Sequence, residues 1–504
     1  KIYKMKTIKT LLACLVLTGL MLSVQAQQKK YKMTTEIPAS IPIADEVETR
    51  FGTLKFTDGF PDEATAQKVY DQMDFQRAVE AIMMTMPGAS LHGFRKGLRK
   101  WGPDNVTACV WEKRMDSKVL LLTPNTTVVY LFMWLDTKDG PLVIETPPKV
   151  LGIIDDHWFR YVADFGAAGP DQGKGGKYIL LPPEYEGDIP EGHYALNSST
   201  YGNWMVARAM LVNGDPAPGA KLIKENLKVY QLEDANNPPA LNFVDVSGEA
   251  FNTIHAMDYT YFEEINELIQ EEPNEAYVPE VLGLLQQIGI EKGKEFAPDA
   301  RMKKILTEAA GVAHAYSRTI LYRNRHKEYA AYPNSGWETG FPGGSHEFLR
   351  DDIRMVDQRV RFHFFATGIT AAMVNKMVGK GSQYMMGLRD SEGNPFDGGK
   401  TYKLNIPANV PMKEFWDVTI YDVQTRSLLQ TDQQFPGITS ADKGTITNAD
   451  GSCDIYFGPT KPEGNVNWLQ TIPGKGWHSL FRLYSPLEPW FDKTWRPGEV
   501  ELVE

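Results

Sequence analysis

The sequence predicts an α+β protein in which two β-sandwich domains of jelly-roll type are linked by a mainly helical segment and preceded by a helical N-terminal region. Three observations support this fold class. A pattern of strand, proline and tryptophan-led strand occurs twice, at residues 142–164 and 404–422. Strand-like alternation surrounds both copies, whereas the regions before and between them have the 3.6-residue period of amphipathic helices. The 504 residues are also enough for several hydrophobic cores.

The repeated pattern indicates that one β unit is used twice. In the first copy we expect a strand that ends at Pro147, a short loop, and a strand from Trp158 to Asp164. In the second copy Trp416 and Asp422 take the places of Trp158 and Asp164, with the same interval between them. Proline ends a strand because its nitrogen cannot donate a hydrogen bond to the neighbouring strand. Coincidence is the alternative, since strand–proline–strand patterns are common.

The first 26 residues have the pattern of a secretory signal peptide with a few translated residues upstream of its start. Met5 is followed by two lysines, an apolar run over residues 11–24 and a small-x-small site that ends at Ala26. This pattern predicts cleavage after Ala26 and export, to the periplasm of a Gram-negative bacterium. Cys14 faintly resembles a lipoprotein site, but the apolar run before it is too short. No later stretch is long and apolar enough to cross a membrane.

The net charge argues against a nucleic-acid partner, and the cysteine content bears on whether the chain forms a disulfide. The formal net charge is −11, and it becomes −15 without residues 1–26, because that segment carries four lysines and no acidic residue. An acidic exported protein is a poor candidate for nucleic-acid binding through bulk charge, so no nucleic-acid partner is expected. The mature chain keeps Cys109 and Cys453. Export permits a disulfide between them, but two cysteines make no framework, so two buried free thiols are the favoured interpretation.

The periodicity divides the chain into five segments. The N-terminal region is expected to hold an extended arm, a helix from Asp62 to Met86 that Pro87 stops, and a basic helix from Ser90 to Trp101. The basic face of that second helix is either solvated or an anion site. The segments are 1–26, signal peptide with upstream residues; 27–104, N-terminal arm and helices; 105–247, first β-sandwich domain; 248–395, helical segment; and 396–504, second β-sandwich domain.

The helical segment has clear start signals. Asp258 opens a helix that runs to Glu271, Pro279 starts one that runs to Ile288, and Asp299 caps a longer helix. After a loop rich in Gly, Pro and Trp, another long helical run is expected over residues 346–378. From residue 400 onward, turn dipeptides with glycine mark a return to short strands.

Seven short motifs resemble a known pair of domains. They are LTPNT (122–126), WLD (134–136) and DGP (139–141) for the first domain, and GGKTY (398–402), FWDVTIYD (415–422), NADGS (448–452) and WRP (495–497) for the second. Together they resemble exported bacterial proteins with the tandem domains of unknown function numbered 1254 and 1214. The resemblance implies β sandwiches similar to the double jelly rolls of large-virus capsid proteins and a tendency to self-associate, but no established activity. In that family an acidic residue commonly follows Asn-Thr, where this chain has Thr127.

Asp155, Asp156 and His157 are the candidate catalytic residues, because they bring acid–base groups and hard-metal ligands together. Neighbours along a strand point in different directions, so a polar loop at a sheet edge is the competing interpretation. No phosphate loop, zinc-protease motif or nucleophile elbow is complete. We predict no cofactor, and a divalent metal has no support beyond these three residues.

The candidate ligand-binding residues come from three places. Arg350, Arg354, Asp357 and Arg361 have helical spacing, which suits either an anion clamp or a structural ladder with a pair between Asp357 and Arg361. The aromatic loop before them either lines a ligand cleft or fills a domain junction. The candidates are Asn125, Arg160, Tyr332, Trp337, Arg350 and Arg354.

Two classes of function remain open at this point. A non-enzymatic role, in assembly or in binding a small molecule or glycan, is favoured because complete catalytic motifs are missing. The alternative is a hydrolase of an anionic small substrate such as a phosphate ester. Exposed sheet edges and C-terminal aromatic residues favour a homo-oligomer, such as a trimeric ring, over a monomer. The sequence does not determine the ligand, the metal dependence or the oligomer number.

Overall fold

The computed structural model describes residues 31–503, and its contacts divide the chain into two units, one up to Gln72 and one from Met73 onward. The predicted signal peptide and Cys14 lie outside the described residues. The first unit holds a small antiparallel sheet of β1 (Glu46–Thr49), β2 (Gly52–Thr57) and β3 (Phe60–Pro61). In the described part of the chain, no helix has both the length and the apolar character needed to span a membrane.

Helix α2 (Glu63–Arg99) is continuous, so the predicted stop at Pro87 is wrong. Proline removes one helical hydrogen bond, which usually breaks a helix. Here tertiary packing outweighs that loss. A Cβ atom at Gly88 would lie 2.5 Å from the Trp158 ring, and one at Gly93 would lie 2.7 Å from the Thr253 carbonyl oxygen. The glycines therefore let the second half of α2 pack closely against the rest of the unit, which holds the helix together across the proline.

The first β domain consists of two sheets. The larger has the order β13-β4-β5-β11-β7-β8, and the smaller has the order β10-β9-β6-β12. Its elements are β4 (Thr107–Val110), β5 (Val128–Asp136), β6 (Leu142–Glu145), β7 (Val150–Asp156), β8 (Tyr161–Gly166), β9 (Lys177–Leu181), β10 (Tyr194–Asn197), β11 (Gly202–Met210), α3 (Ala217–Asn226), β12 (Lys228–Gln231) and β13 (Asn242–Asp245). Apolar side chains from both sheets form one core between them.

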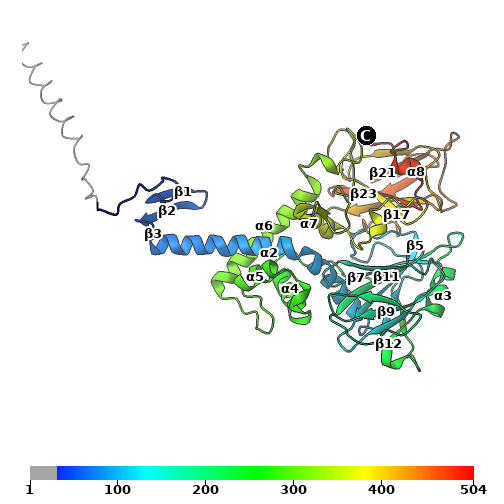
Figure 1. The fold of residues 1–504 in the computed structure, drawn as a ribbon. Coiled ribbons are helices and arrows are strands. Elements are labelled where there is room, and N and C mark those ends of the chain that lie inside the picture. The colour runs from blue at the N-terminus through cyan, green and yellow to red at the C-terminus, as the bar shows by residue number, and fades with distance from the viewer. Residues whose placement is uncertain (1–30, 504) are drawn as a thin grey trace, which may run out of the picture. The chain divides into compact units, whose positions relative to one another are not determined.

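The second β domain has the same construction. Its sheets have the orders β14-β17-β23-β19-β20 and β22-β21-β18-β24. Its elements are β14 (Trp337–Glu338), β17 (Ser382–Gly387), β18 (Tyr402–Ile406), β19 (Trp416–Asp422), β20 (Gly437–Thr439), β21 (Cys453–Gly458), β22 (Asn467–Gln470), β23 (Trp477–Tyr484), α8 (Glu488–Phe491) and β24 (Val500–Leu502). The α+β fold class with two β sandwiches, expected from the sequence, is confirmed. Figure 1 shows the two sandwiches as neighbours, with β17 and β23 near β5 and β11.

Strand order shows that the two domains repeat one topology. The run β5 to β12, with α3 before its last strand, matches the run β17 to β24, with α8 before its last strand, in sequence order and in pairing. The residue correspondence predicted for the repeat is nevertheless wrong. Trp416 begins β19, whereas Trp158 lies in the turn after β7. Strands β7 and β19 are the equivalent pair, each with seven residues, and they end at Asp156 and Asp422.

The segment between the domains contains α4 (Thr260–Glu271), α5 (Pro279–Gln287) and α6 (Ala300–Tyr322), close to the predicted helices. The Asp299 side chain accepts a hydrogen bond from the Met302 N–H, as expected of a helix cap. The long helix expected over residues 346–378 is wrong. This stretch forms the hairpin β15 (Leu349–Arg350) and β16 (Ile353–Arg354), then only α7 (Val356–Phe365).

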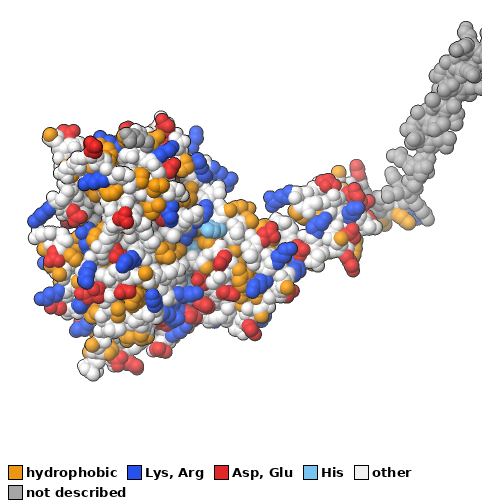
Figure 2. Space-filling view, turned by 180° about the vertical axis from the view of Figure 1, so that it is seen from behind, with side chains coloured by type: hydrophobic (Ala, Val, Ile, Leu, Met, Phe, Trp, Pro, Cys, Tyr) orange, Lys and Arg blue, Asp and Glu red, His pale blue; other side chains and the backbone are white. Residues whose placement is uncertain are grey.

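Both cysteines of the described chain, Cys109 and Cys453, are buried and free, as the sequence analysis favoured. Burial raises the pKa of the Cys109 thiol to about 12 and that of Cys453 to about 11. The surface, by contrast, is mixed in charge. Figure 2 shows acidic and basic side chains interspersed over the face that it presents.

Candidate functional site

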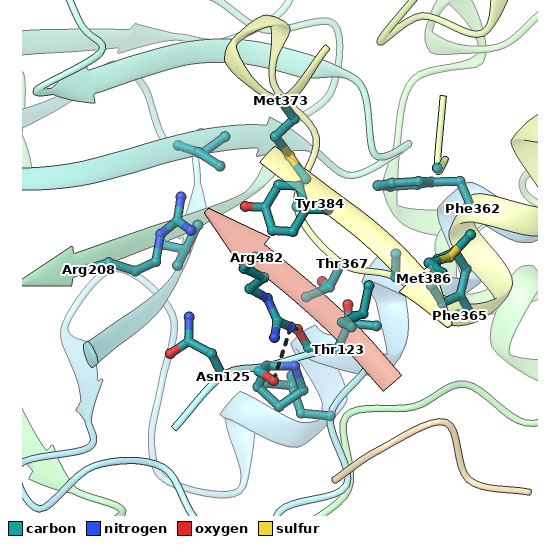
Figure 3. Close-up of a pocket in the computed structure, with 18 of the residues that line it drawn as sticks. Thr123, Asn125, Arg208, Phe362, Phe365, Thr367, Met373, Tyr384, Met386 and Arg482 are labelled. Atoms are coloured by element: carbon teal, nitrogen blue, oxygen red, sulfur yellow. Dashed lines mark hydrogen bonds between the residues drawn. The ribbon is translucent and has the colours of Figure 1, made fainter. Parts of the chain in front are cut away.

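A cavity of about 140 Å³ lies between the two β domains. Strands β5, β7 and β11 of the first domain, strands β17 and β23 of the second, and the segment around α7 supply its walls. Figure 3 shows Arg208, Arg482, Tyr384 and Asn125 gathered on one side, with Phe362, Phe365 and Met386 on the other and Met373 next to Tyr384. The cavity therefore has a polar end and an apolar end.

Two arginines at the polar end occupy equivalent positions in the repeated topology. Arg208 on β11 pairs across the sheet with Tyr130 on β5, and Arg482 on β23 pairs with Tyr384 on β17. On their other side Arg208 pairs with Leu151, whereas Arg482 pairs with Asp417. Residues that face each other on neighbouring strands project to the same side of the sheet. The repeat thus places a carboxylate beside one arginine and an apolar side chain beside the other.

Arg482 is fully engaged by its surroundings. Its Nη1 lies 3.0 Å from Asp417 Oδ1, and its Nη2 donates to the carbonyl oxygen of Thr123 at 2.9 Å. The Thr127 hydroxyl donates to the other oxygen of Asp417 at 3.3 Å. The position where the resembling family often has an acid therefore supports the Asp417 carboxylate in this chain. Arg482 is a neutralised structural group that links β23 to the loop before β5.

Arg208 has no such partner. Within residues 31–503, no carboxylate oxygen lies within 4.0 Å of its guanidinium, although its side chain is only 9% exposed. The charge of Arg208 acts on the Asp164 carboxyl group, but Asp164 accepts hydrogen bonds from Thr370 and Tyr161 and not from Arg208. Burial raises the pKa of Asp164, which favours its neutral form. An arginine keeps its charge in proteins, so Arg208 is a buried cation without a full counter-charge.

Phenol groups surround Arg208. Burial acts against its charge, but Tyr384, Tyr130 and Tyr484 outweigh burial and keep the pKa of Arg208 above its ordinary value. The Asn125 side-chain amide donates to the Tyr484 hydroxyl at 2.6 Å, and the Asn125 backbone N–H donates to the Tyr130 hydroxyl at 3.4 Å. Each of these oxygens is thus an acceptor for Asn125, and its own proton can be donated elsewhere. Figure 3 shows the Tyr384 hydroxyl turned toward Arg208. The polar end is therefore rich in hydrogen-bond donors.

The lining also defines which chemistry this cavity suits. The described side chains around it include no carboxylate, imidazole or thiol, and their polar groups are guanidinium, phenol, indole, amide and hydroxyl groups. Such a set can hold an anion, but it lacks an ordinary general base. Elsewhere in residues 31–503, no cluster of three or more His, Cys, Asp or Glu residues is arranged to hold a metal ion.

The three candidate catalytic residues do not converge. Asp155 and Asp156 are the last residues of β7, an interior strand of its sheet, and His157 begins the turn that follows. The two aspartates therefore do not lie in a polar loop at the sheet edge. Asp155 accepts the Ile369 N–H at 3.0 Å, and burial raises its pKa well above the ordinary value. Asp156 points to the opposite face and accepts from Arg160 Nε at 2.7 Å. Alternation along the strand separates these two carboxyl groups, so they cannot easily bind one metal ion together, as the competing interpretation in the sequence stated.

His157 belongs to a third, separate network. Its Nδ1 lies 2.7 Å from Glu272 Oε1, and its Nε2 lies 3.4 Å from Nδ1 of His92. Nε2 of His92 lies 2.9 Å from Glu267. Burial, followed by the charge of His92, lowers the pKa of His157 well below its ordinary value. This chain of four side chains joins the first β domain to α2 and α4, which gives His157 a structural environment.

The candidate binding residues are dispersed. Asn125 lines the cavity described above, whereas Arg160 and Arg354 line a different hollow beside α7. Arg350 is exposed and pairs with Glu328 at 2.6 Å. Asp357 and Arg361 both lie in α7, but the predicted pair between them does not form, because Arg361 is buried and pairs with Glu338.

Tyr332 and Trp337 are part of the hydrophobic core of the second β domain. The Trp337 indole N–H donates to the Gly498 carbonyl oxygen at 2.8 Å, and its side chain is 1% exposed. These two residues fill a junction, whereas Phe341 of the same aromatic loop lines the cavity between the β domains. Each of the two interpretations of the loop therefore fits part of it.

Sequence reasoning missed Arg208, Tyr384 and Tyr130. One signal was present: β11 and β23 are apolar strands that each contain a single arginine. A lone arginine inside a buried strand is unusual and needs a partner. Without the correct alignment of the two repeats, the sequence could not show that one arginine has an acidic neighbour and the other does not.

Comparison with family models supports the domain pair. A model described as a protein of unknown function (DUF1254) matches residues 107–231, and one described as a protein of unknown function (DUF1214) matches residues 381–488. The chain carries the DUF1254–DUF1214 pair. The two models cover most of the two sandwiches that enclose the cavity. The cavity therefore lies where the two matched domains meet. No curated protein matches the sequence.

Solved structures support the fold alone. A crystal structure of a Vibrio parahaemolyticus protein matches with 16% identity and a TM-score of 0.52, over 86% of this chain and 100% of that one. An uncharacterized protein from Burkholderia cenocepacia matches with 11% identity and a TM-score of 0.37, over 88% of this chain and 97% of that one. The first of these supports the overall fold of this chain.

Proposed function

We propose that the protein binds a small, mainly apolar anion with a carboxylate group in the cavity between its two β domains. The observation that carries this proposal is Arg208, a buried guanidinium that faces the cavity without a carboxylate, although its counterpart Arg482 has Asp417. Removing an ion from water without a partner is unfavourable by several kcal/mol. A bound carboxylate supplies that partner, and the phenol groups of Tyr130 and Tyr384, which also line the cavity, supply further donors.

The volume of the cavity and the wall opposite Arg208 restrict the size and the polarity of the group that carries the carboxylate. A volume of about 140 Å³ is close to that of an apolar cavity of ~150 Å³ that holds benzene in another protein. Phe362, Phe365 and Met386 provide an apolar wall opposite Arg208. A ring or short hydrocarbon chain fits this end, so benzoate is a suitable probe for the class.

Calorimetric titration of the protein with benzoate tests the proposal. We expect benzoate to bind and benzamide, its neutral counterpart, to bind at least about tenfold more weakly, since hydrogen bonds to charged groups contribute about 1.5–3 kcal/mol. Arg208→Gln should weaken benzoate binding by a similar factor, whereas Arg325→Gln, at an arginine whose side chain is 85% exposed, should not. Equal binding of benzoate and benzamide, or unchanged binding by Arg208→Gln, would contradict the proposal.

Hydrolysis of an anionic small substrate remains the second candidate. One observation favours it: Asp156, Arg160, Arg354 and His346 line the same hollow. Against it, Asp156 is already bound by Arg160 and by two backbone N–H groups. Release of nitrophenol from para-nitrophenyl phosphate, measured with and without a divalent metal, tests this candidate. Turnover that is lost in an Asp155→Ala plus Asp156→Ala variant would support it, and the absence of turnover would remove it.

We also propose that the protein is exported and self-associates. The support for export is the charged start, the apolar run and the site at Ala26, all outside the described residues. The support for self-association is the presence of edge strands such as β8 and β10 in the sandwiches. Intact-mass analysis of protein from the native cell tests the first, with a mature N-terminus at Gln27 expected. Light scattering tests the second, and a monomer mass at micromolar concentration would contradict it.

A further inference from the structure

A second hollow, of about 320 Å³, lies on the other side of α7 from the cavity between the β domains. Phe362 and Phe365 of α7 line the first cavity, whereas Arg359 and His363 line the second. Further walls come from the turn after β7, the start of β8, the end of β10, the α5 region, the loop before β15 and Pro87 of α2. The helix therefore separates two sites with different linings.

Three guanidinium groups line this second hollow. Arg160 is committed, because its Nε donates to Asp156 and its Nη1 donates to the Ala276 carbonyl oxygen at 2.9 Å. Arg354 donates one N–H group to the Glu347 carbonyl oxygen. Arg359 makes only long contacts of 3.4 Å, to the backbone oxygen and the sulfur of Met84, and its buried Nε has no partner among the described residues. Two of the three arginines thus keep donors for a ligand.

The arginines also crowd one another. Burial, followed by the charge of Arg354, lowers the pKa of Arg359 to about 10. Burial is likewise the largest influence on Arg354, whose pKa is lowered in spite of Glu347, with Arg160 adding to the effect. In residues 31–503, no carboxylate oxygen lies within 4.0 Å of the guanidinium of Arg354 or of Arg359. The Asp156 carboxylate already pairs with Arg160, and the Glu347 side chain, which also lines the hollow, is exposed to solvent. The charge of Glu347 acts on Arg354 and that of Glu80 acts on Arg359, but neither carboxylate forms an ion pair with them. This hollow therefore holds two like charges without an ion-paired counter-charge.

We propose that the second hollow binds the phosphoryl group of a small phosphate ester between Arg354 and Arg359. Guanidinium forks match the geometry of phosphate oxygens and donate to them in pairs. A phosphate monoester carries a charge of about −1.5 to −2 at neutral pH, which suits two arginines without ion-pair partners better than a single carboxylate charge does. The hollow is larger than the cavity between the β domains, and Trp158, Phe159 and Phe348 line it, so an organic group can accompany the phosphate.

Calorimetric titration of the full mature chain with phenyl phosphate, and separately with inorganic phosphate, tests this inference. We expect phenyl phosphate to bind more tightly than inorganic phosphate and to bind less tightly as salt is raised. Arg354→Gln and Arg359→Gln should each weaken phenyl phosphate binding about tenfold or more. Arg350→Gln is the matched control, because Arg350 is an exposed arginine four residues away that pairs with Glu328 outside the hollow.

Arg359 is more buried than Arg354, so the test can still be read if one of the two variants fails to fold. Arg354 is exposed enough that Arg354→Gln should fold even if Arg359→Gln does not. No binding of phenyl phosphate at 10 mM or below, on the order of the weakest affinities that calorimetry resolves, would overturn the inference. Unchanged binding by Arg354→Gln, or an equal loss with Arg350→Gln, would overturn it too. Benzoate binding should be the same in Arg354→Gln as in the natural chain, so this inference and the proposed carboxylate site can fail separately.

Discussion

The substitution Leu151→Asp should close the carboxylate site by giving Arg208 the counter-charge that its counterpart already has. Leu151 faces Arg208 across β7 and β11, as Asp417 faces Arg482 across β19 and β23. In that second pair the charged atoms are 3.0 Å apart. An aspartate at position 151 can therefore reach the guanidinium of Arg208 by the same cross-strand geometry.

The expected effect on binding follows from charge repulsion. Two unit charges 4 Å apart interact by about 4 kcal/mol at an effective dielectric constant of 20. An added carboxylate would oppose a bound carboxylate by an energy of this order, which corresponds to a loss of affinity of about 10³-fold. Leu151→Asn is the control, because it has nearly the same shape and the same loss of apolar burial but no charge. Both variants should lose about 1.5–3 kcal/mol of stability through the lost leucine, and Leu151→Asp should regain part of it from the new ion pair.

Benzoate titration of the two variants tests whether the ligand recognises the charge of Arg208. The expected result is strong binding loss in Leu151→Asp and a much smaller change in Leu151→Asn, with both proteins folded by circular dichroism. If Leu151→Asp binds benzoate as tightly as Leu151→Asn does, then the charge of Arg208 is not what the ligand recognises, and the reasoning from the repeated topology is wrong.

Three further predictions concern stability and reactivity. Burial lowers the pKa of His478 to about 3, so the native chain does not take up the proton that the unfolded chain binds below about pH 6.5. The free energy of unfolding therefore falls as pH falls below that value. In urea unfolding, the free energy of unfolding of His478→Phe relative to that of the natural chain should be about 2 kcal/mol higher at pH 5 than at pH 7.5. Gly88→Ala should cost about 1–3 kcal/mol because of the contact with Trp158, whereas Gly311→Ala, with open space at its Cβ position in α6, should stabilise the chain by up to about 1 kcal/mol. Cys109 and Cys453 should not react with Ellman's reagent at pH 8 until the protein unfolds, since burial keeps both thiols protonated; prompt reaction of either thiol in the native protein would contradict this.

Local signals predicted many of the elements correctly, and tertiary packing decided the failures. The cap at Asp299 and the starts of α4 and α5 depend on neighbouring residues, so the sequence shows them. The continuity of α2 through Pro87 depends on residues far along the chain that pack against its glycines, and no local rule contains that information. Strand β7 was missed because a buried interior strand that ends in two aspartates looks like a polar loop.

The candidate site was predicted less well than the fold, for a related reason. Asp155, Asp156 and His157 are adjacent in sequence, which made them conspicuous, yet a strand sends adjacent side chains to different environments. Arg208 and Arg482 are far apart in sequence and each is inconspicuous alone. Only the pairing of β11 with β7, and of β23 with β19, reveals that one arginine is neutralised and the other is not.

Carrying both sandwiches on a single chain has a consequence for how such a site can arise. In a symmetric dimer of one sandwich, Leu151 and Asp417 would be the same residue, so both arginines would be neutralised or neither would be. Covalent duplication frees the two halves to diverge. One half can then keep its ion pair as a rigid support while the other leaves its cation without one, so that a symmetric plan gives a single asymmetric cavity.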